Sequence, residues 1–416
     1  MSPNFADLWR VFGRIGLLSF GGPAAQIALM HKELVDDRPW LTEKQFLGAL
    51  SFCMLLPGPE AMQLATYAGW RLKGLWGGIL AGALFVVPGA LVILTLAAAY
   101  ISYGTLPIVQ AAFIGVKAAV VIVVLQALLK VSKKALKSNF AWVLAVFAFF
   151  AIYVLQLPFP LIIALAAAVG AVLAKPHEED TPRISSASPI SHSNTIQTVV
   201  LWSALWAAPV VLVAAINHTF LTEIALFFSK LAVVTFGGAY AVLAYMTQTV
   251  SFDFGWISAG EMIDALGLAE TTPGPLILVT EFVGLLAGYK EGGAGLMIAA
   301  GALTLWCTFI PCFLWIFAAA PYVEQLLSQP RLKGALDAIT AAVVGVILNL
   351  SLWFALHVLF SETVATDIGL IPVFHSIDFS AVILLALAGA LLLWRKMNLP
   401  LVLAISATCG ILLSFV

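Results

Sequence analysis

Residues 46–70 read FLGALSFCMLLPGPEAMQLATYAGW, and residues 261–288 read EMIDALGLAETTPGPLILVTEFVGLLAG. Both stretches are apolar and long enough for a bilayer span, which takes about 20 mostly apolar residues. Each carries Pro-Gly-Pro near its middle. Proline removes a backbone donor and disfavours helix in the residue before it. We therefore expect two membrane segments that each contain a broken helix.

The rest of the chain is similarly apolar. Its 416 residues are 62% hydrophobic and 10% charged, whereas a soluble chain has about 25% charged residues. The apolar blocks are too long for barrel strands, which alternate over about 10 residues. An all-α polytopic membrane protein with about thirteen transmembrane segments is therefore predicted. The segments are 12–30, 46–70, 76–101, 108–130, 141–156, 159–174, 199–217, 221–246, 261–288, 294–320, 334–360, 379–394 and 398–416.

The chain repeats itself. Three motifs of the first half recur 216 residues later, in constant register: Phe20-Gly21-Gly22 as Phe236-Gly237-Gly238, Trp40 as Trp256, and Pro57-Gly58-Pro59 as Pro273-Gly274-Pro275. Two further matches have an offset of 223: Pro88 with Pro311, and Ala118–Val121 with Ala341–Val344. The expected organisation is a first repeat over 1–174, a cytoplasmic polar linker over 175–198, a connecting span over 199–217, and a second repeat over 218–416.

The repeats are expected to be inverted in the membrane. Equivalent segments lie an odd number of crossings apart, because one extra segment separates two halves of six. This inversion fails if one of the two motif segments in each half does not cross. Inverted repeats are typical of secondary transporters, whose site lies at the repeat interface near the midplane.

Lysine and arginine set the orientation, because they favour cytoplasmic loops. The loop 130–137 holds Lys130, Lys133, Lys134 and Lys137, whereas 361–378 holds neither residue type. These loops predict a cytoplasmic N-terminus and an extracytoplasmic C-terminus. The loop 31–45 is an exception, in which acidic residues offset the basic ones.

The motifs predict an anion site. A helix that starts after Pro-Gly-Pro points free N–H groups and a positive dipole end into the membrane centre. Arg14 and Lys230 each stand six residues before the phenylalanine of Phe-Gly-Gly, and Lys117 is a third cation in an apolar run. Kinks that only aid packing, and cations that snorkel to the interface, are the structural alternatives. The predicted substrate-binding residues are Arg14, Lys230, Gly21, Gly22, Pro57, Gly58, Pro59, Gln63, Gly237, Gly238, Pro273, Gly274, Pro275 and Lys117.

Other polar residues near the motifs extend this prediction. Further hydrogen-bond donors to an oxyanion are Gln26, Ser19, Thr235, Thr66, Tyr240, Thr271 and Thr272. Glu60, Glu270 and Glu281 are candidates for proton coupling, because a buried carboxyl tends to stay protonated. Alternatively, Glu60 caps its own helix. The other two acids could instead pair with Lys230 or Lys117.

Two long blocks resemble the chromate ion transporter family. They are SFGGPAAQIALMHKELVDDRPWLTEKQFLGALSFCMLLPGPEAMQLATYAGWRLKG, and FFSKLAVVTFGGAYAVLAYMTQ together with LGLAETTPGPLILVTEFVG. The resemblance covers about residues 10–130 and 220–350, and it is to the long-chain, two-domain type. It implies export of chromate across the cytoplasmic membrane, although some members handle sulfate or other oxyanions. Glu60 stands where many members have threonine, which leaves the coupling in doubt.

The sequence therefore predicts a secondary transporter of chromate that works by alternating access. A transporter of sulfate or another anion, or an anion channel, remains the alternative. An enzyme is not expected, because no metal-ligand cluster, nucleophile–base arrangement or phosphate loop is evident, and no cofactor is predicted. The expected partners are the oxyanion and the lipid bilayer. Protons and a second copy of the chain stay open, and the net charge of −1 argues against nucleic acid.

Overall fold

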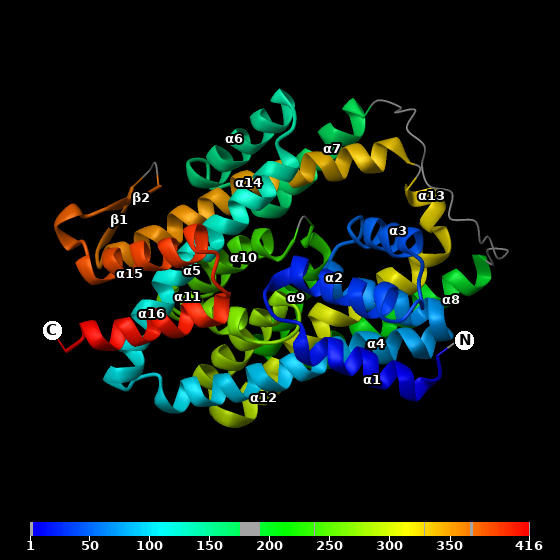
Figure 1. Ribbon diagram of the computed structural model, residues 1–416, viewed down its shortest axis with the longest axis horizontal. Helices are drawn as coiled ribbons and strands as arrows, with labels where there is room; N and C mark the ends of the chain where they lie inside the picture. The colour runs from blue at the N-terminus through cyan, green and yellow to red at the C-terminus, as the bar shows by residue number, and fades with distance from the viewer. Residues whose placement is uncertain (1–2, 175–191, 237, 328, 367–368, 416) are drawn as a thin grey trace. The chain divides into compact units, whose positions relative to one another are not determined.

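The computed structural model describes residues 3–174, 192–236, 238–327, 329–366 and 369–415. The described part of the chain is mainly helical, as the composition predicts (Figure 1). Most of the predicted cytoplasmic linker (residues 175–191) and the predicted site residue Gly237 lie outside the described residues.

The first half contains α1 (Phe5–Leu18), α2 (Gly22–His31), η1 (Lys32–Asp36), α3 (Glu43–Cys53), α4 (Glu60–Tyr103), α5 (Pro107–Ala135), α6 (Asn139–Tyr153) and α7 (Phe159–Leu173). The connecting helix is α8 (His192–Ala215). The second half contains α9 (Thr219–Val234), α10 (Ala239–Gln248), η2 (Thr249–Asp253), α11 (Ala259–Thr271), η3 (Leu276–Leu278), α12 (Val279–Ala319), η4 (Ala320–Tyr322), α13 (Val323–Leu327), α14 (Pro330–Leu359), η5 (Phe374–Ser376), α15 (Phe379–Gly389), η6 (Ala390–Trp394) and α16 (Leu399–Leu413).

A short antiparallel pair departs from the purely helical prediction. Strands β1 (Thr363–Thr366) and β2 (Gly369–Pro372) lie in the loop between α14 and α15, with Thr363 opposite Pro372. The chain therefore holds a small hairpin where the sequence predicted only a loop.

Within the described residues, five helical stretches are long and apolar enough to cross a membrane: Glu60–Tyr103, Pro107–Ala135, Ser193–Ala215, Leu276–Tyr322 and Pro330–Leu359. Four shorter apolar helices accompany them: Asn139–Tyr153, Phe159–Leu173, Phe379–Trp394 and Leu399–Leu413. These apolar helices are those of a multi-pass membrane protein.

The two longest of these stretches each turn back on themselves. The backbone leaves the helical region at Lys73–Gly74 and at Gly292–Gly293. Gly74 has φ 63° and ψ −156°, and Gly293 has φ 74° and ψ −161°. A Cβ on Gly69 would lie 2.2 Å from the carbonyl oxygen of Gly77, although eight residues of straight helix rise about 12 Å. Only glycine adopts these dihedral angles readily. Gly74 and Gly293 therefore allow the same reversal once in each half.

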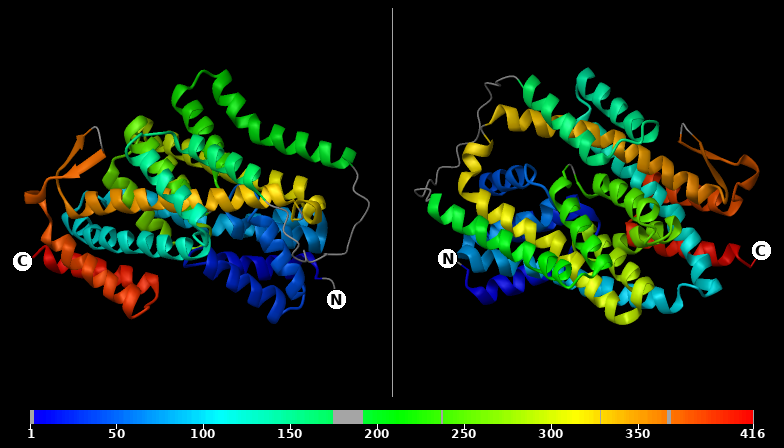
Figure 2. Two further views of the ribbon diagram at one scale, coloured as in Figure 1. Left: turned by 90° about the horizontal axis from the view of Figure 1, so that it is seen from above. Right: turned by 180° about the vertical axis from the view of Figure 1, so that it is seen from behind.

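The described chain forms two compact units, and each draws on both halves of the sequence. Unit 1 comprises Met1–Thr95, Ala174–Ala239 and Thr272–Lys333, and unit 2 comprises Leu96–Leu173, Tyr240–Thr271 and Gly334–Val416. In unit 1, α12 packs against α8 and α9 (Figure 2). In unit 2, α5 packs against α11, α15 and α16. Buried side chains of α5, α15, η6 and α16 form one apolar cluster there.

Candidate functional site

Four helix breaks lie at the duplicated motifs. In the first half, α1 ends at Leu18 before α2 begins at Gly22, and α3 ends at Cys53 before α4 begins at Glu60. The second half breaks at the equivalent places, between α9 and α10 and between α11 and η3. Both Pro-Gly-Pro sequences are therefore non-helical, as their prolines predict, and Glu60 is the first residue of a new helix.

The breaks of the two halves exchange backbone hydrogen bonds within unit 1. The Gly58 N–H donates to the carbonyl oxygen of Thr235 at 2.8 Å, and the Gly274 N–H donates to that of Ser19 at 2.9 Å. Both glycines and both acceptors stand 216 positions apart in the sequence, so one bond is the counterpart of the other. Each Pro-Gly-Pro turn is thus held by the other half of the chain.

Two buried glutamines reinforce these turns. The Gln26 Nε2 donates to the carbonyl oxygen of Gly274 at 2.7 Å, and the Gln63 Nε2 donates to that of Pro57 at 2.7 Å. Their Oε1 atoms have no hydrogen-bond partner among the described residues. Since a buried polar atom rarely stays unpaired, these two acceptors are available to a hydrogen-bond donor such as a water molecule.

The predicted hydroxyl donors serve their own helices instead. Ser19 and Thr235 each donate to the carbonyl oxygen four residues earlier, both at 2.6 Å. Thr66 donates to Met62 at 3.0 Å, and Thr271 donates to Leu268 at 2.7 Å. Each hydroxyl has a single proton to donate, so these four are not free donors in this conformation.

A small cavity lies at the meeting point of the breaks in unit 1. Its volume is about 10 Å³, which accommodates about one water molecule. A tetrahedral oxyanion, with four oxygens around a central atom, does not fit, so this conformation is closed at this point. The lining residues are Pro23, Gln26, Pro59, Glu60, Ala61, Thr235, Ala239, Pro275, Leu276 and Ile277.

The two repeat-related cations lie away from this cavity. Arg14 is 59% exposed, and its Nη1 lies 3.4 Å from the Glu33 Oε1. Glu33 is buried and also pairs with Arg38. Lys230 is exposed on α9. Neither Arg14 nor Lys230 lines the cavity, so their part in substrate binding stays a prediction.

The predicted coupling acids occupy three different settings. Glu60 lines the cavity of unit 1. Glu281 is 3% exposed in the same unit, and within the described chain its Oε2 has no hydrogen-bond partner. Glu270 is buried in unit 2 and accepts a hydrogen bond from the Tyr240 hydroxyl at 2.7 Å. An isolated buried carboxylate is costly, which makes Glu281 chemically the most suitable of the three to hold a proton.

The third predicted cation belongs to unit 2. The Lys117 Nζ lies 3.4 Å from the Asp264 Oδ1, and the Tyr100 hydroxyl donates to the Asp264 Oδ2 at 2.9 Å. The sequence motifs alone do not bring these three residues together, because they come from α4, α5 and α11.

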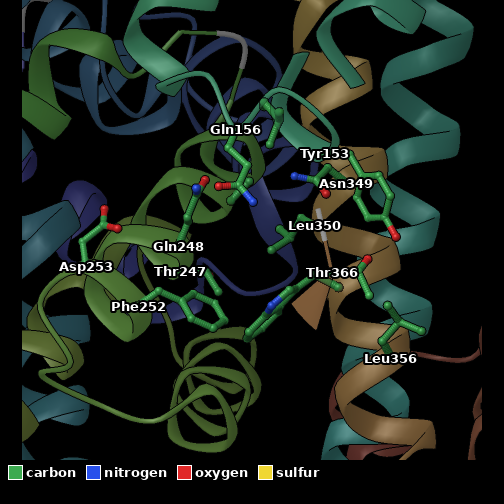
Figure 3. A pocket seen from close by; sticks show the side chains of 13 residues that line it. Tyr153, Gln156, Thr247, Gln248, Phe252, Asp253, Asn349, Leu350, Leu356 and Thr366 are labelled. Atoms are coloured by element: carbon green, nitrogen blue, oxygen red, sulfur yellow. The ribbon is translucent and has the colours of Figure 1, made fainter. Parts of the chain in front are cut away.

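A larger cavity of about 320 Å³ also lies in unit 2. Figure 3 shows the side-chain amides of Gln156, Gln248 and Asn349 gathered on one side of it. Among the described residues that line it, Asp253 is the one charged side chain, and none is a lysine or arginine. This arrangement suits water or an uncharged polar solute better than a dianion.

No sequence motif marks that cavity. Its walls come from three segments of the chain, residues 152–156, 244–253 and 349–366. Gln156 has φ 50°, which is uncommon for a residue other than glycine. That conformation is visible only in the folded chain, so sequence analysis had no means of finding it.

Comparison with known proteins gives a consistent picture. The family model described as chromate transporter matches residues 6–171 and 222–411. A probable chromate transport protein of Synechococcus elongatus is 30% identical over 98% of this chain and 95% of that protein. A chromate transport protein of Pseudomonas aeruginosa is 32% identical over 83% of this chain and 79% of its own length.

A shorter relative matches only part of the chain. The uncharacterized transporter YwrB of Bacillus subtilis is 32% identical over 40% of this chain and 86% of its own length. No solved structure matches the chain.

Proposed function

Because the chain belongs to the chromate transporter family, we propose that it exports chromate across the cytoplasmic membrane as a secondary transporter. The transport works by alternating access at the interface of two inverted repeats. The N-terminus is cytoplasmic and the C-terminus extracytoplasmic in this proposal.

The exchanged hydrogen bonds between the helix breaks carry the proposal. The Gly58 N–H binds Thr235 and the Gly274 N–H binds Ser19, so the backbone of one half completes the break of the other. Non-helical backbone at membrane depth is tolerated where it is buried in protein or lines a cavity. Residues at the starts of α2, α4, α10 and η3 line one cavity. The positive dipole ends of the helices that start there therefore lie near the same point, which favours an anion.

Helix length supports an inverted arrangement with fewer crossings than the sequence predicts. Helices α1, α2 and α3 have 14, 10 and 11 residues. At about 1.5 Å per residue, each falls short of the hydrocarbon core, which is about 30 Å thick. We place both motif segments of each half as re-entrant hairpins. Removing two crossings from each half leaves an odd number between equivalent segments, so the inversion is retained.

The crossings are then the five long stretches and the four shorter apolar helices, nine in all. The four shorter helices also fall short of the core, but we count them as crossings because none contains an acidic or basic side chain, whereas α1 and α3 do. The two longest stretches contribute only the arm that follows the reversal at Gly74 or Gly293. This count keeps the loop 130–137 on the cytoplasmic side and the loop 361–378 outside, in accord with their lysine and arginine content.

The membrane potential favours export of a dianion. Moving two negative charges out of an inside-negative cell releases about 4.6 kcal/mol per 100 mV. That energy sustains roughly a thousandfold gradient. Uptake of the same ion would require about three protons for each dianion merely to reverse the charge movement.

Chromate flux into and out of liposomes that hold the purified protein tests the proposal, with the membrane potential set by an ionophore. We expect saturable flux toward the positive side. Arg14→Ala and Lys230→Ala, assayed beside the wild type, show whether these exposed cations take part. Flux that only accumulates chromate on the negative side would contradict export.

The same assay separates the alternatives. Excess sulfate that abolishes chromate flux would indicate a general transporter of tetrahedral oxyanions. Flux that never saturates and drives no counter-transport would indicate an anion channel. An absence of chromate flux would rule out chromate as the substrate.

A further inference from the structure

Unit 2 holds a partly buried ion pair that the helix breaks do not involve. We call Lys117, Asp264 and Tyr100 the Lys117 cluster. The Lys117 Nζ lies 3.4 Å from the Asp264 Oδ1, and the Tyr100 hydroxyl donates to the Asp264 Oδ2 at 2.9 Å. Asp264 is 5% exposed. Ionisable groups in membrane helices are costly in free energy and are usually functional. We therefore expect the Lys117 cluster to have a function.

The ion pair between Lys117 and Asp264 is not reinforced by a hydrogen bond. The contact between Lys117 and Asp264 is an ion pair without hydrogen-bond geometry, and the Oδ1 has no hydrogen-bond partner among the described residues. The Lys117 side chain is 27% exposed. Gly260, in the first turn of α11, lies beside the ammonium, and a Cβ there would be 3.5 Å from the Nζ. An ammonium has three N–H donors and no acceptor, so Lys117 can donate to a further oxygen atom of a ligand.

The cluster is not part of the repeated framework. The offset of 223 that relates α5 to α14 places Thr340 at the position of Lys117. The offset of 216 that relates α3 to α11 places Gly48 at the position of Asp264. A pair that served only to hold equivalent helices together would be expected in both halves, whereas neither charge is present in the other half.

Few other charges face the pair. On α11 itself, Glu261 and Glu270 flank Asp264, and the Ser258 backbone N–H donates to Glu261. On α5, the remaining cations are Lys130, Lys133 and Lys134, near its C-terminal end. Helix α16, which also packs on α11, contains no acidic or basic side chain, and its one thiol is that of Cys409. Lys117 is therefore the cation that lies next to the Asp264 carboxylate.

We propose that Asp264 is a built-in counter-ion of Lys117, and that the oxyanion substrate replaces it at the ammonium when Asp264 takes up a proton. This inference rests on the proposed transport of a dianion. The exchange makes and breaks no covalent bond: the proton comes from water and binds a carboxylate oxygen. After the exchange, the Lys117 ammonium faces the dianion and the protonated Asp264 beside it is neutral. Without protonation, the Asp264 carboxylate would be a second anion next to the substrate.

Equilibrium binding of radiolabelled chromate to the purified protein tests the exchange, at pH values above neutrality where chromate is a dianion. Lys117→Gln should weaken binding about tenfold or more, because it removes the charge that the substrate meets. Asp264→Asn should do the opposite: it should strengthen binding severalfold and remove the pH dependence. Tyr100→Phe removes a hydrogen bond to the carboxylate and should move the pH dependence toward higher pH.

The design includes two internal controls. Lys133→Gln removes an exposed cation from the same helix and should leave binding unchanged. The double variant Lys117→Gln/Asp264→Asn should bind as weakly as Lys117→Gln alone, because the counter-ion acts only through the lysine. Gel filtration and thermal melting establish that each variant is folded.

The outcomes distinguish this inference from the function on which it rests. A wild type that binds and transports chromate, combined with Asp264→Asn that binds more weakly or keeps its pH dependence, overturns the counter-ion exchange alone. Unchanged binding in Lys117→Gln does the same. A wild type that neither binds nor transports chromate refutes the proposed function, and the exchange is refuted with it.

Discussion

At the residue scale, Glu33 is a buried carboxylate between two arginines. It is 2% exposed and pairs with Arg14 and Arg38. Removing either arginine leaves the other, so Arg14→Ala or Arg38→Ala should cost about 1 kcal/mol or less. The double variant leaves a buried charge unpaired and should cost about 3–5 kcal/mol. Thermal melting in detergent measures this, and a double variant no worse than the sum of the singles would contradict it.

The acidic partners of His31 lead us to expect that the stability of the protein depends on pH. The hydrogen bond to Glu43, at 2.6 Å, is the main cause of a raised pKa of His31, and Asp36 adds to it. The folded protein therefore binds the proton more tightly than the unfolded chain. The stabilisation is fully present below the unfolded pKa of about 6.5 and is lost as the pH rises through the raised folded pKa.

The test compares melting temperatures across that pH range. His31→Gln should flatten the decline of stability between about pH 6.5 and the raised pKa. His375→Gln, which removes an exposed histidine from η5, serves as the matched control. A wild type whose melting temperature does not change over this range would show that the pair contributes nothing.

At the scale of elements, the Pro-Gly-Pro turns require their glycines. Gly58 has φ 123°, and a Cβ there would lie 2.8 Å from the Gln63 Nε2. Gly58→Ala should therefore cost about 1–3 kcal/mol in backbone strain, and chromate flux should fall with it. Gly13→Ala is a suitable control, because it lies inside α1 with nothing within 4 Å of the added Cβ. That change should stabilise the helix by about 0.5–1 kcal/mol.

At the scale of the whole molecule, the inverted arrangement predicts the side on which each loop lies. The chain has four cysteines, so labelling would use a background in which all four are replaced. Lys133→Cys should react with an impermeant maleimide only from the cytoplasmic side, and Glu362→Cys only from outside. Both positions are exposed. Labelling of both from the same side would refute the inversion.

Much of this architecture could be predicted from local sequence. Hydropathy predicted the apolar helices, and the prolines predicted where α3 and α11 end. Both follow from local chemistry: a run of apolar side chains partitions into lipid, and proline cannot continue a helix. The constant offset of 216 also indicated which segments are equivalent. The reversals at Gly74 and Gly293 were not distinguishable from other glycine-rich helix positions.

The sequence by itself determined the membrane class, the family, the duplicated motifs and the breaks, because each of these is visible in short residue patterns that do not depend on how the chain folds. Only the tertiary structure decided which charges meet. Arg14 pairs with Glu33 instead of lining the cavity, and Lys117 meets Asp264. Long-range pairing depends on how helices pack, and a cation in an apolar run carries no sign of its partner. The exchange of hydrogen bonds between the two halves likewise exists only once the chain has folded.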